Sequence, residues 1–208
     1  MMVSNRYFED KFEIFVPALP VKYNNLSTNL EDVKVEISDN KIKIYGLVPD
    51  HVYNNVLISF KDDLGRKYEL KFDNVITSQP TTPNNKFVYE AYKNGLGRKP
   101  DHIGFKYWYN RLYNMDITAV SFVNEMINSH EFNTIYETDN EKIEALYRII
   151  VGRDPDEDGF NYWVSVYSTL INEMKINETQ AMMDIANKVM GEDEFINIVD
   201  KTDFLYSK

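Results

Sequence analysis

Three aspartates at alternate positions have the spacing that most suggests metal chemistry in this chain. Asp154, Asp156 and Asp158 precede Gly159 and match the start of the D-x-[DN]-x-[DN]-G loop that binds calcium. The twelfth position of that loop needs a bidentate acid, but counting from Asp154 places Ser165 there. The sequence therefore leaves two interpretations, a weak calcium site or a helix-capping aspartate with solvated neighbours, and predicts no other cofactor.

The other chemistry-bearing residue types do not form a catalytic or zinc-binding pattern. The histidines are His51, His102 and His130, and none has a partner four residues away as a helical zinc site requires. The chain has no cysteine, which excludes disulfides, thiol catalysis and cysteine-ligated metals. We find no nucleophile elbow and no glycine-rich phosphate loop. We therefore expect a protein that is not an enzyme.

Composition narrows the classes of partner. The 208 residues carry a net charge of −10, and the pI is about 4.8. A uniformly acidic protein repels phosphate backbones and anionic lipids, so we expect no nucleic-acid binding and no membrane insertion. The first ten residues lack the hydrophobic core of a signal peptide. We expect the chain to be a fragment of a longer protein, without its signal peptide.

One twelve-residue motif occurs twice, 55 residues apart, and both tryptophans of the chain lie in it. Eight of its twelve positions are identical. The matching residues are Gly97, Arg98, Pro100, Asp101, Gly104, Phe105, Tyr107 and Trp108 in the first copy, and Gly152, Arg153, Pro155, Asp156, Gly159, Phe160, Tyr162 and Trp163 in the second. Such a repeat indicates two copies of one supersecondary unit that pack together.

Each residue type of the motif has a structural role at the junction of two helices. The first glycine ends a helix in the left-handed conformation, and the proline prevents the chain from continuing it. The aspartate caps the next helix, and the second glycine allows close approach of the backbone. We expect the arginine to bind helix-end carbonyls or an acidic neighbour, and the Tyr-Trp pair to bury aromatic area between helices.

The motif lies in the second of two regions with different periodicity. Residues 79–85 have linker composition, with two prolines among small polar residues. From residue 86 onward apolar residues follow a helical period, and Ser129 is a predicted N-cap. We predict an all-α two-copy module over 86–208, with copies at about 86–137 and 140–203. The second copy carries about eight extra residues, around 168–177.

The first region, 1–78, alternates apolar and polar residues as strands do. Strands are predicted at 11–16, 33–37, 41–45, 53–60 and 67–72, with a turn at 38–40. Such short strands predict a small antiparallel β-sandwich. The fold class is therefore multidomain, β followed by α.

Leu47, Pro49 and Tyr53 resemble the tyrosine corner of fibronectin type III and related immunoglobulin-like sandwiches. In that feature the tyrosine hydroxyl bonds to backbone a few residues upstream. The region is short for a complete domain, so a strand can be missing or irregular. The alternative is a generic meander in which Tyr53 is simply a core residue.

The repeated segment resembles the bacterial family catalogued as domain of unknown function 4214. The resemblance rests on Leu146-Tyr147-Arg148 through Trp163, on Ala91-Tyr92-Lys93 through Trp108, and on Ser129-His130-Glu131-Phe132. The first copy departs from the pattern by lacking the Leu and Arg before its Gly. The family is distantly similar to the helical linker domains of phycobilisomes, and its members are commonly appended to secreted, S-layer or carbohydrate-active proteins.

The resemblance implies a non-catalytic accessory module of a bacterial surface or secreted protein. Its expected partners are other domains of a larger surface protein or proteins of a surface assembly. The abundance of Tyr and Trp leaves a second hypothesis, binding of cell-wall or extracellular polysaccharide, because aromatic rings stack on sugars. Aromatic residues at helical spacing are more often core residues, which favours the first hypothesis.

Overall fold

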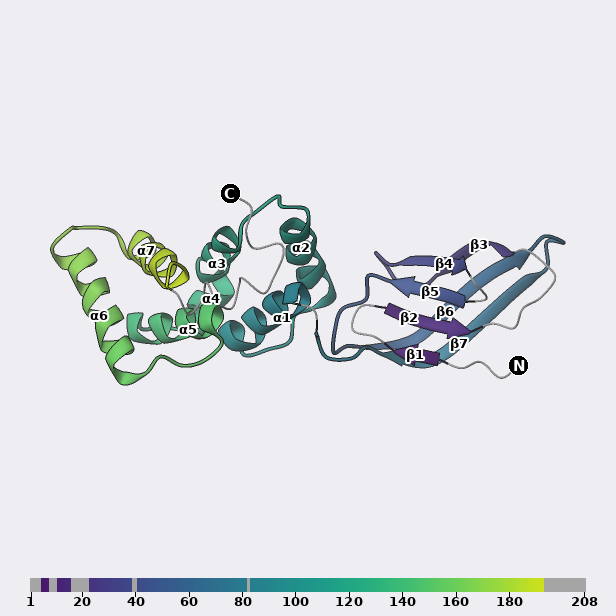
Figure 1. Cartoon of the computed structure of the whole chain (residues 1–208), viewed down its shortest axis with the longest axis horizontal. Helices are drawn as coiled ribbons and strands as arrows, with labels where there is room; N and C mark the ends of the chain where they lie inside the picture. Colours follow the sequence, from purple (N-terminus) through teal and green to yellow (C-terminus); the bar gives the residue numbers. More distant parts are fainter. Residues whose placement is uncertain (1–4, 8–10, 16–22, 39–40, 82, 193–208) are drawn as a thin grey trace. The chain divides into compact units, whose positions relative to one another are not determined.

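A computed structural model describes residues 5–7, 11–15, 23–38, 41–81 and 83–192 (Figure 1). Internal contacts divide the chain into two units, Met1–Thr81 and Thr82–Lys208. The strands are β1 Asn5–Tyr7, β2 Lys11–Phe15, β3 Tyr23–Thr28, β4 Lys34–Ser38, β5 Lys41–Tyr45, β6 Val52–Asp62 and β7 Lys67–Ile76. The helices are α1 Pro83–Leu96, α2 His102–Tyr113, α3 Ala119–Ile127, α4 His130–Ile135, α5 Asp139–Val151, α6 Glu157–Asn172 and α7 Glu178–Met190. Strands followed by helices confirm the predicted fold class.

The strands of the first unit form two antiparallel sheets with the orders β1-β2-β5-β4 and β3-β6-β7. In the first sheet Phe12 lies opposite Ile44, and Ile14 lies opposite Ile42. All four side chains are fully buried, as the alternation of the sequence requires. Phe12 meets Phe72 of the other sheet edge to face, with ring centroids 5.3 Å apart. The apolar faces of the two sheets thus enclose the core.

The connection between β5 and β6 contains the predicted corner hydrogen bond. The backbone N–H of Val48 donates to the Tyr53 hydroxyl at 2.7 Å. Leu47 and Pro49 are buried beside it. Burial raises the pKa of Tyr53 to about 12, although the hydrogen bond from Val48 acts in the opposite direction. The Thr77 hydroxyl donates to the Val48 carbonyl at 2.6 Å, which ties the corner to the residue after β7.

Two strands of the first unit were not predicted from the sequence. β1 has only three residues, too few to show a period. β3 has the polar sequence YNNLST, and its register with β6 shifts between Asn24 and Ser27. Asn25 has a φ of 52°, so the strand is irregular at that point. The expected irregular strand is therefore β3, and the predicted turn at 38–40 falls partly outside the described residues.

The second unit repeats one order of helices. α1, α2 and α3 correspond to α5, α6 and α7, and α4 follows α3 with Ser129 as its N-cap, as predicted. The end of the predicted second copy, residues 193–203, lies outside the described residues. α1 begins at Pro83, inside the predicted linker, because proline is favourable at the first position of a helix.

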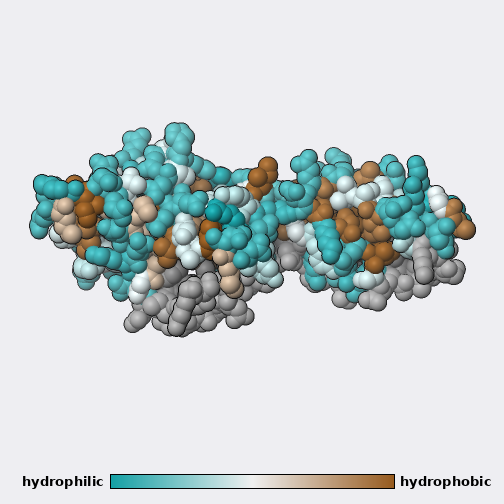
Figure 2. Space-filling view, turned by 90° about the horizontal axis from the view of Figure 1, so that it is seen from above, coloured by the Kyte–Doolittle hydropathy of each residue, from teal (hydrophilic) through white to brown (hydrophobic). Residues whose placement is uncertain are grey.

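The two copies pack most closely where α1 meets α5. A Cβ atom at Gly95 would lie 2.6 Å from Cδ1 of Ile149, so only glycine fits against that side chain. Within the described part, no helix combines the length and hydropathy that crossing a membrane requires. Figure 2 shows small, separate apolar patches among hydrophilic atoms on the face that it presents.

Candidate functional site

The first copy of the motif forms the junction between α1 and α2. Gly97 follows α1 with a φ of 66°, a conformation that glycine adopts without strain. Asp101 is the N-cap of α2 and accepts from the backbone N–H of Gly104 at 2.8 Å. A Cβ atom at Gly104 would lie 2.7 Å from the Tyr92 hydroxyl, so the glycine permits a close contact. The predicted roles of these residues are therefore observed.

The second copy repeats this geometry between α5 and α6. Gly152 caps α5 in the left-handed conformation with a φ of 82°. Asp156 is the N-cap of α6 and accepts from the backbone N–H of Gly159 at 2.7 Å. The repeat in sequence is thus a repeat of helix-stop and helix-start geometry, with Pro155 in the connection.

Arg98 joins the first motif to α4. Its guanidinium forms two hydrogen bonds to the carboxylate of Glu131, from Nε at 2.6 Å and from Nη2 at 2.9 Å. It also donates to the Lys99 carbonyl and lies 5.1 Å from the centre of the Tyr92 ring. The predicted acidic partner is present, whereas the carbonyl belongs to the connection between α1 and α2 and not to a helix end. The Arg98 pair lowers the pKa of Glu131 below its ordinary value, and burial opposes that effect only in part.

Arg153 occupies the equivalent position in the second copy. It donates to the Asp154 carbonyl at 2.9 Å and to the Tyr147 hydroxyl at 3.4 Å. Its guanidinium also lies 5.4 Å from the centre of the Tyr147 ring. Both arginines thus bind the carbonyl of the next residue and approach a tyrosine on the preceding helix.

The Tyr-Trp pairs differ from the prediction, because only the tryptophan turns inward. Trp163 is buried, and the half-buried Trp108 donates to the Tyr92 hydroxyl at 3.1 Å. Tyr107 and Tyr162 are 50% and 57% exposed. Successive residues of a helix point about 100° apart, and in α2 and α6 the tryptophan position lies on the inward face while the tyrosine position lies at its exposed side. We call Tyr107 and Tyr162 the motif tyrosines.

The three aspartates of the predicted calcium loop have separate roles. Asp154 accepts a hydrogen bond from Arg148 at 2.9 Å, and Asp156 caps α6. Asp158 is exposed in the first turn of α6. Among the described residues, no group of three or more His, Asp or Glu side chains is arranged to hold a metal ion. The geometry therefore supports the capping interpretation of this segment.

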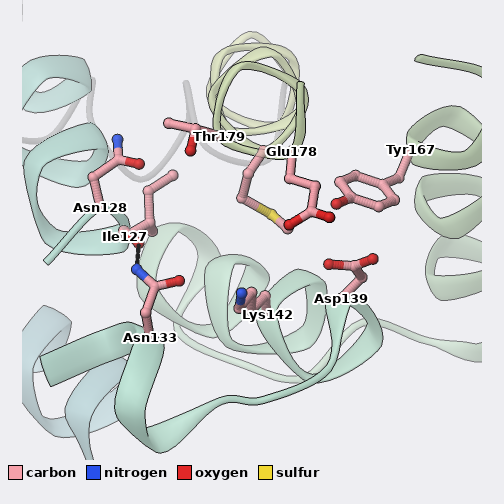
Figure 3. A pocket seen from close by; sticks show the side chains of 9 residues that line it. Ile127, Asn128, Asn133, Asp139, Lys142, Tyr167, Glu178 and Thr179 are labelled. Atoms are coloured by element: carbon pink, nitrogen blue, oxygen red, sulfur yellow. Dashed lines mark hydrogen bonds between the residues drawn. The ribbon is translucent and has the colours of Figure 1, made fainter. Parts of the chain in front are cut away.

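A pocket that was not predicted from the sequence lies where α3, α4, α5, α6 and α7 meet (Figure 3). Its volume is about 200 Å³. It is lined by Ile127, Asn128, Asn133, Asp139, Lys142, Tyr167, Glu178, Thr179 and Met182. We call it the Tyr167 pocket. Because its residues come from five helices, no local motif reveals it.

The acidic residues of the Tyr167 pocket open two helices. Asp139 follows the N-cap Thr138 of α5, and Glu178 follows the N-cap Asn177 of α7. Both carboxylates lie near the Tyr167 hydroxyl in Figure 3. Burial raises the pKa of Tyr167 above its ordinary value, and interaction with Asp139 and then with Glu178 raises it further. The hydroxyl therefore keeps its proton at neutral pH.

Comparison with known proteins identifies one sequence family. No curated protein sequence matches the chain significantly. A solved structure of Astrotactin-2, described as a conserved vertebrate-specific and perforin-like membrane protein involved in neuronal development, is 12% identical and has a TM-score of 0.26. That alignment covers 94% of this chain and 37% of the other, and the TM-score is too low to support an argument.

The family model named DUF4214, domain of unknown function, matches residues 71–136 and 123–173. Together the two segments extend from within β7 to the residue after α6. Each segment includes one copy of the motif. The C-terminal part of the chain therefore carries the sequence signature of DUF4214.

Proposed function

We propose that this chain is a non-catalytic accessory module of a bacterial surface or secreted protein, and that it binds other proteins of a surface assembly. The observation that carries the proposal is the exposure of the motif tyrosines. Tyr107 and Tyr162 occupy the same position in the two copies, and each remains at least half exposed. Large aromatic residues at exposed positions are typical of binding surfaces.

The other residues of the motif differ from the tyrosines because each has a structural role within the helical unit. The glycines and aspartates form helix ends, and Arg98 forms an ion pair with Glu131. The tryptophan side chains contribute to the helical core. Stability of the fold thus accounts for these residue types. The tyrosine rings do meet the adjacent tryptophan edge to face, at 4.7 Å in the first copy and 4.9 Å in the second, but that contact leaves at least half of each tyrosine exposed. A surface role accounts for the tyrosines directly.

The first unit has features of a known class of adhesive and cell-surface domains. Its strand order β1-β2-β5-β4 and β3-β6-β7 corresponds to the ABED and CFG sheets of constant-type immunoglobulin domains. The hydrogen bond between Val48 and Tyr53 supports the same assignment. We infer an immunoglobulin-like or fibronectin-like sandwich, which is consistent with a module of a multidomain surface protein.

Site-specific photo-crosslinking tests the proposed surface. A photoreactive phenylalanine analogue replaces Tyr107 or Tyr162 in the protein expressed in its cell of origin, and mass spectrometry identifies the adducts. Tyr113 is 59% exposed but lies outside the motif, so it is the matched control position. We expect the same partner protein from positions 107 and 162 and not from 113. Adducts that are absent, or equal at all three positions, would contradict the proposal.

Polysaccharide binding is the second candidate, because an exposed tyrosine ring can stack on a sugar. The motif tyrosines again carry the argument, since Trp163 is only 5% exposed and cannot serve as a platform. Affinity electrophoresis in gels that contain cell-wall polysaccharides compares the wild type with Y107A/Y162A. Retardation of the wild type alone would favour this candidate over protein binding.

A further inference from the structure

The Tyr167 pocket contains a buried polar group without a partner. Tyr167 is 7% exposed, and its hydroxyl has no hydrogen-bond partner of suitable geometry among the described residues. A buried hydroxyl in that state costs free energy relative to one that is hydrogen-bonded. Figure 3 places this hydroxyl beside the carboxylates of Asp139 and Glu178. An unsatisfied group in this position points to a ligand that completes the hydrogen bonding.

The polar atoms left available in the pocket are mainly acceptors. The side-chain amide of Asn133 donates to the carbonyls of Ile127 and Ser129, and that of Asn128 donates to the carbonyl of Asn124. The Asn133 amide therefore uses both of its N–H donors within the protein, and the Asn128 amide uses one of its two, so these residues offer the pocket mainly their oxygens. The carboxylates of the pocket are also acceptors. A ligand rich in N–H donors would satisfy such a surface.

The charge of the pocket also favours a ligand that donates hydrogen bonds, and in particular a cation. Within the described residues, no ion pair joins Asp139 or Glu178 to a basic side chain, and Lys142 is the one cationic residue that lines the pocket. Two carboxylates and one ammonium leave a net negative charge. Both acids also lie in the first turn of a helix, where a negative charge interacts favourably with the positive end of the helix dipole. That role explains an acid at each helix start, but it does not explain why both face the same unsatisfied hydroxyl.

We propose that the Tyr167 pocket binds the primary ammonium group of a small organic amine, with Asp139 and Glu178 as its carboxylate acceptors. The ammonium also donates to the Tyr167 hydroxyl oxygen, and the hydroxyl proton then donates to one of the two carboxylates. A volume of about 200 Å³ is below that of pockets for drug-sized ligands, so it suits a short aliphatic amine. The methylene groups of such an amine can lie against Ile127 and Met182. This site is independent of the motif tyrosines.

Calorimetric titration of the whole chain with n-butylammonium chloride tests the proposal, with n-butanol as the uncharged probe of similar shape. We expect binding of butylammonium, weaker binding at high salt, and no binding of butanol. D139N and E178Q should each reduce the affinity about tenfold, because each removes one charge next to the ammonium. Y167F should reduce it less. Circular dichroism checks that each variant is folded.

Two matched variants control for general effects of charge and of a lost hydroxyl. Glu173 is an exposed acid just after α6, and Tyr162 is an exposed tyrosine of the same helix. E173Q and Y162F should bind butylammonium as the wild type does. Equal affinity in wild type, D139N and E178Q would overturn the proposal, as would equal binding of butanol or an absence of binding.

The same titration distinguishes two sources of the ammonium group. Nα-acetyl-lysine amide presents the ammonium of a lysine side chain with both backbone ends blocked. If butylammonium and this compound bind with similar affinity, a lysine of a partner protein also fits the site. If only butylammonium binds, the ligand is a free amine. A hexose that binds in place of both would overturn the proposal.

Discussion

At the scale of single residues, Arg98 and Glu131 form the contact that most clearly joins distant parts of the sequence. The two residues are 33 positions apart and form a bidentate pair. Because the Arg98 side chain is 38% exposed, solvent screening limits its contribution to about 1 kcal/mol. A double-mutant cycle with R98Q and E131Q, followed by urea unfolding, measures that coupling. The longer surface pair Lys93–Glu90 is the control and should couple by only about 0.3 kcal/mol.

The same pair makes stability depend on pH. Arg98 depresses the pKa of Glu131 below its ordinary value of 4.5 in the folded protein. The stabilisation is therefore fully present above pH 4.5 and is lost as the pH falls through the lower, folded pKa. We expect E131Q to lose less stability than the wild type between pH 7 and pH 3 in urea unfolding. E173Q is the control, and an equal slope for E131Q and wild type would contradict this assignment.

The aspartates at positions 154, 156 and 158 give a prediction about calcium. Asp154 is bonded to Arg148 and Asp156 to the start of α6, so binding an ion would require breaking existing contacts. We expect the Tm after chelator treatment to be unchanged by millimolar calcium, both in wild type and in D158A. A calcium-dependent rise in Tm that D158A abolishes would restore the calcium interpretation.

At the scale of elements, the contact between α1 and α5 depends on the absence of a side chain at Gly95. A methyl group there would overlap the end of Ile149, so G95A should destabilise the helical unit by about 1 to 3 kcal/mol. I149A removes the overlapping atoms, so G95A/I149A should cost less than the sum of the two single variants. The control pair is G95A with I14A in the β-unit, where the effects should add. Urea unfolding measures the three single and the two double variants.

The helix ends at the two copies of the motif could be predicted because their signals are local. Asp101 and Asp156 each cap a helix through an N–H only three residues away, and the left-handed Gly97 and Gly152 end the preceding helices. β3 was missed because its polar residues and register shift hide the alternation. The exposure of a motif tyrosine depends on which face of α2 or α6 packs inward. The Tyr167 pocket depends on five helices, which no short sequence pattern specifies.

At the scale of the whole molecule, the division at residues 81 and 82 predicts two unfolding events. Each unit has its own apolar core, and the core of the first unit draws on both of its sheets. We expect scanning calorimetry to show two transitions, one lowered in Tm by I14A and the other by G95A. A single transition that both variants lower equally would mean that the units unfold cooperatively.

The contact at Gly95 also has an evolutionary consequence. By the 55-residue offset, Gly95 corresponds to Ile150 and Ile149 corresponds to Asn94. A tandem duplication begins with two identical copies. If both copies had the sequence of the first, an asparagine would lie against Gly95 in place of Ile149. If both copies had the sequence of the second, an isoleucine would replace Gly95 and would overlap Ile149. The two copies therefore complement each other at this contact, and recombination that left two identical copies would not regenerate the interface.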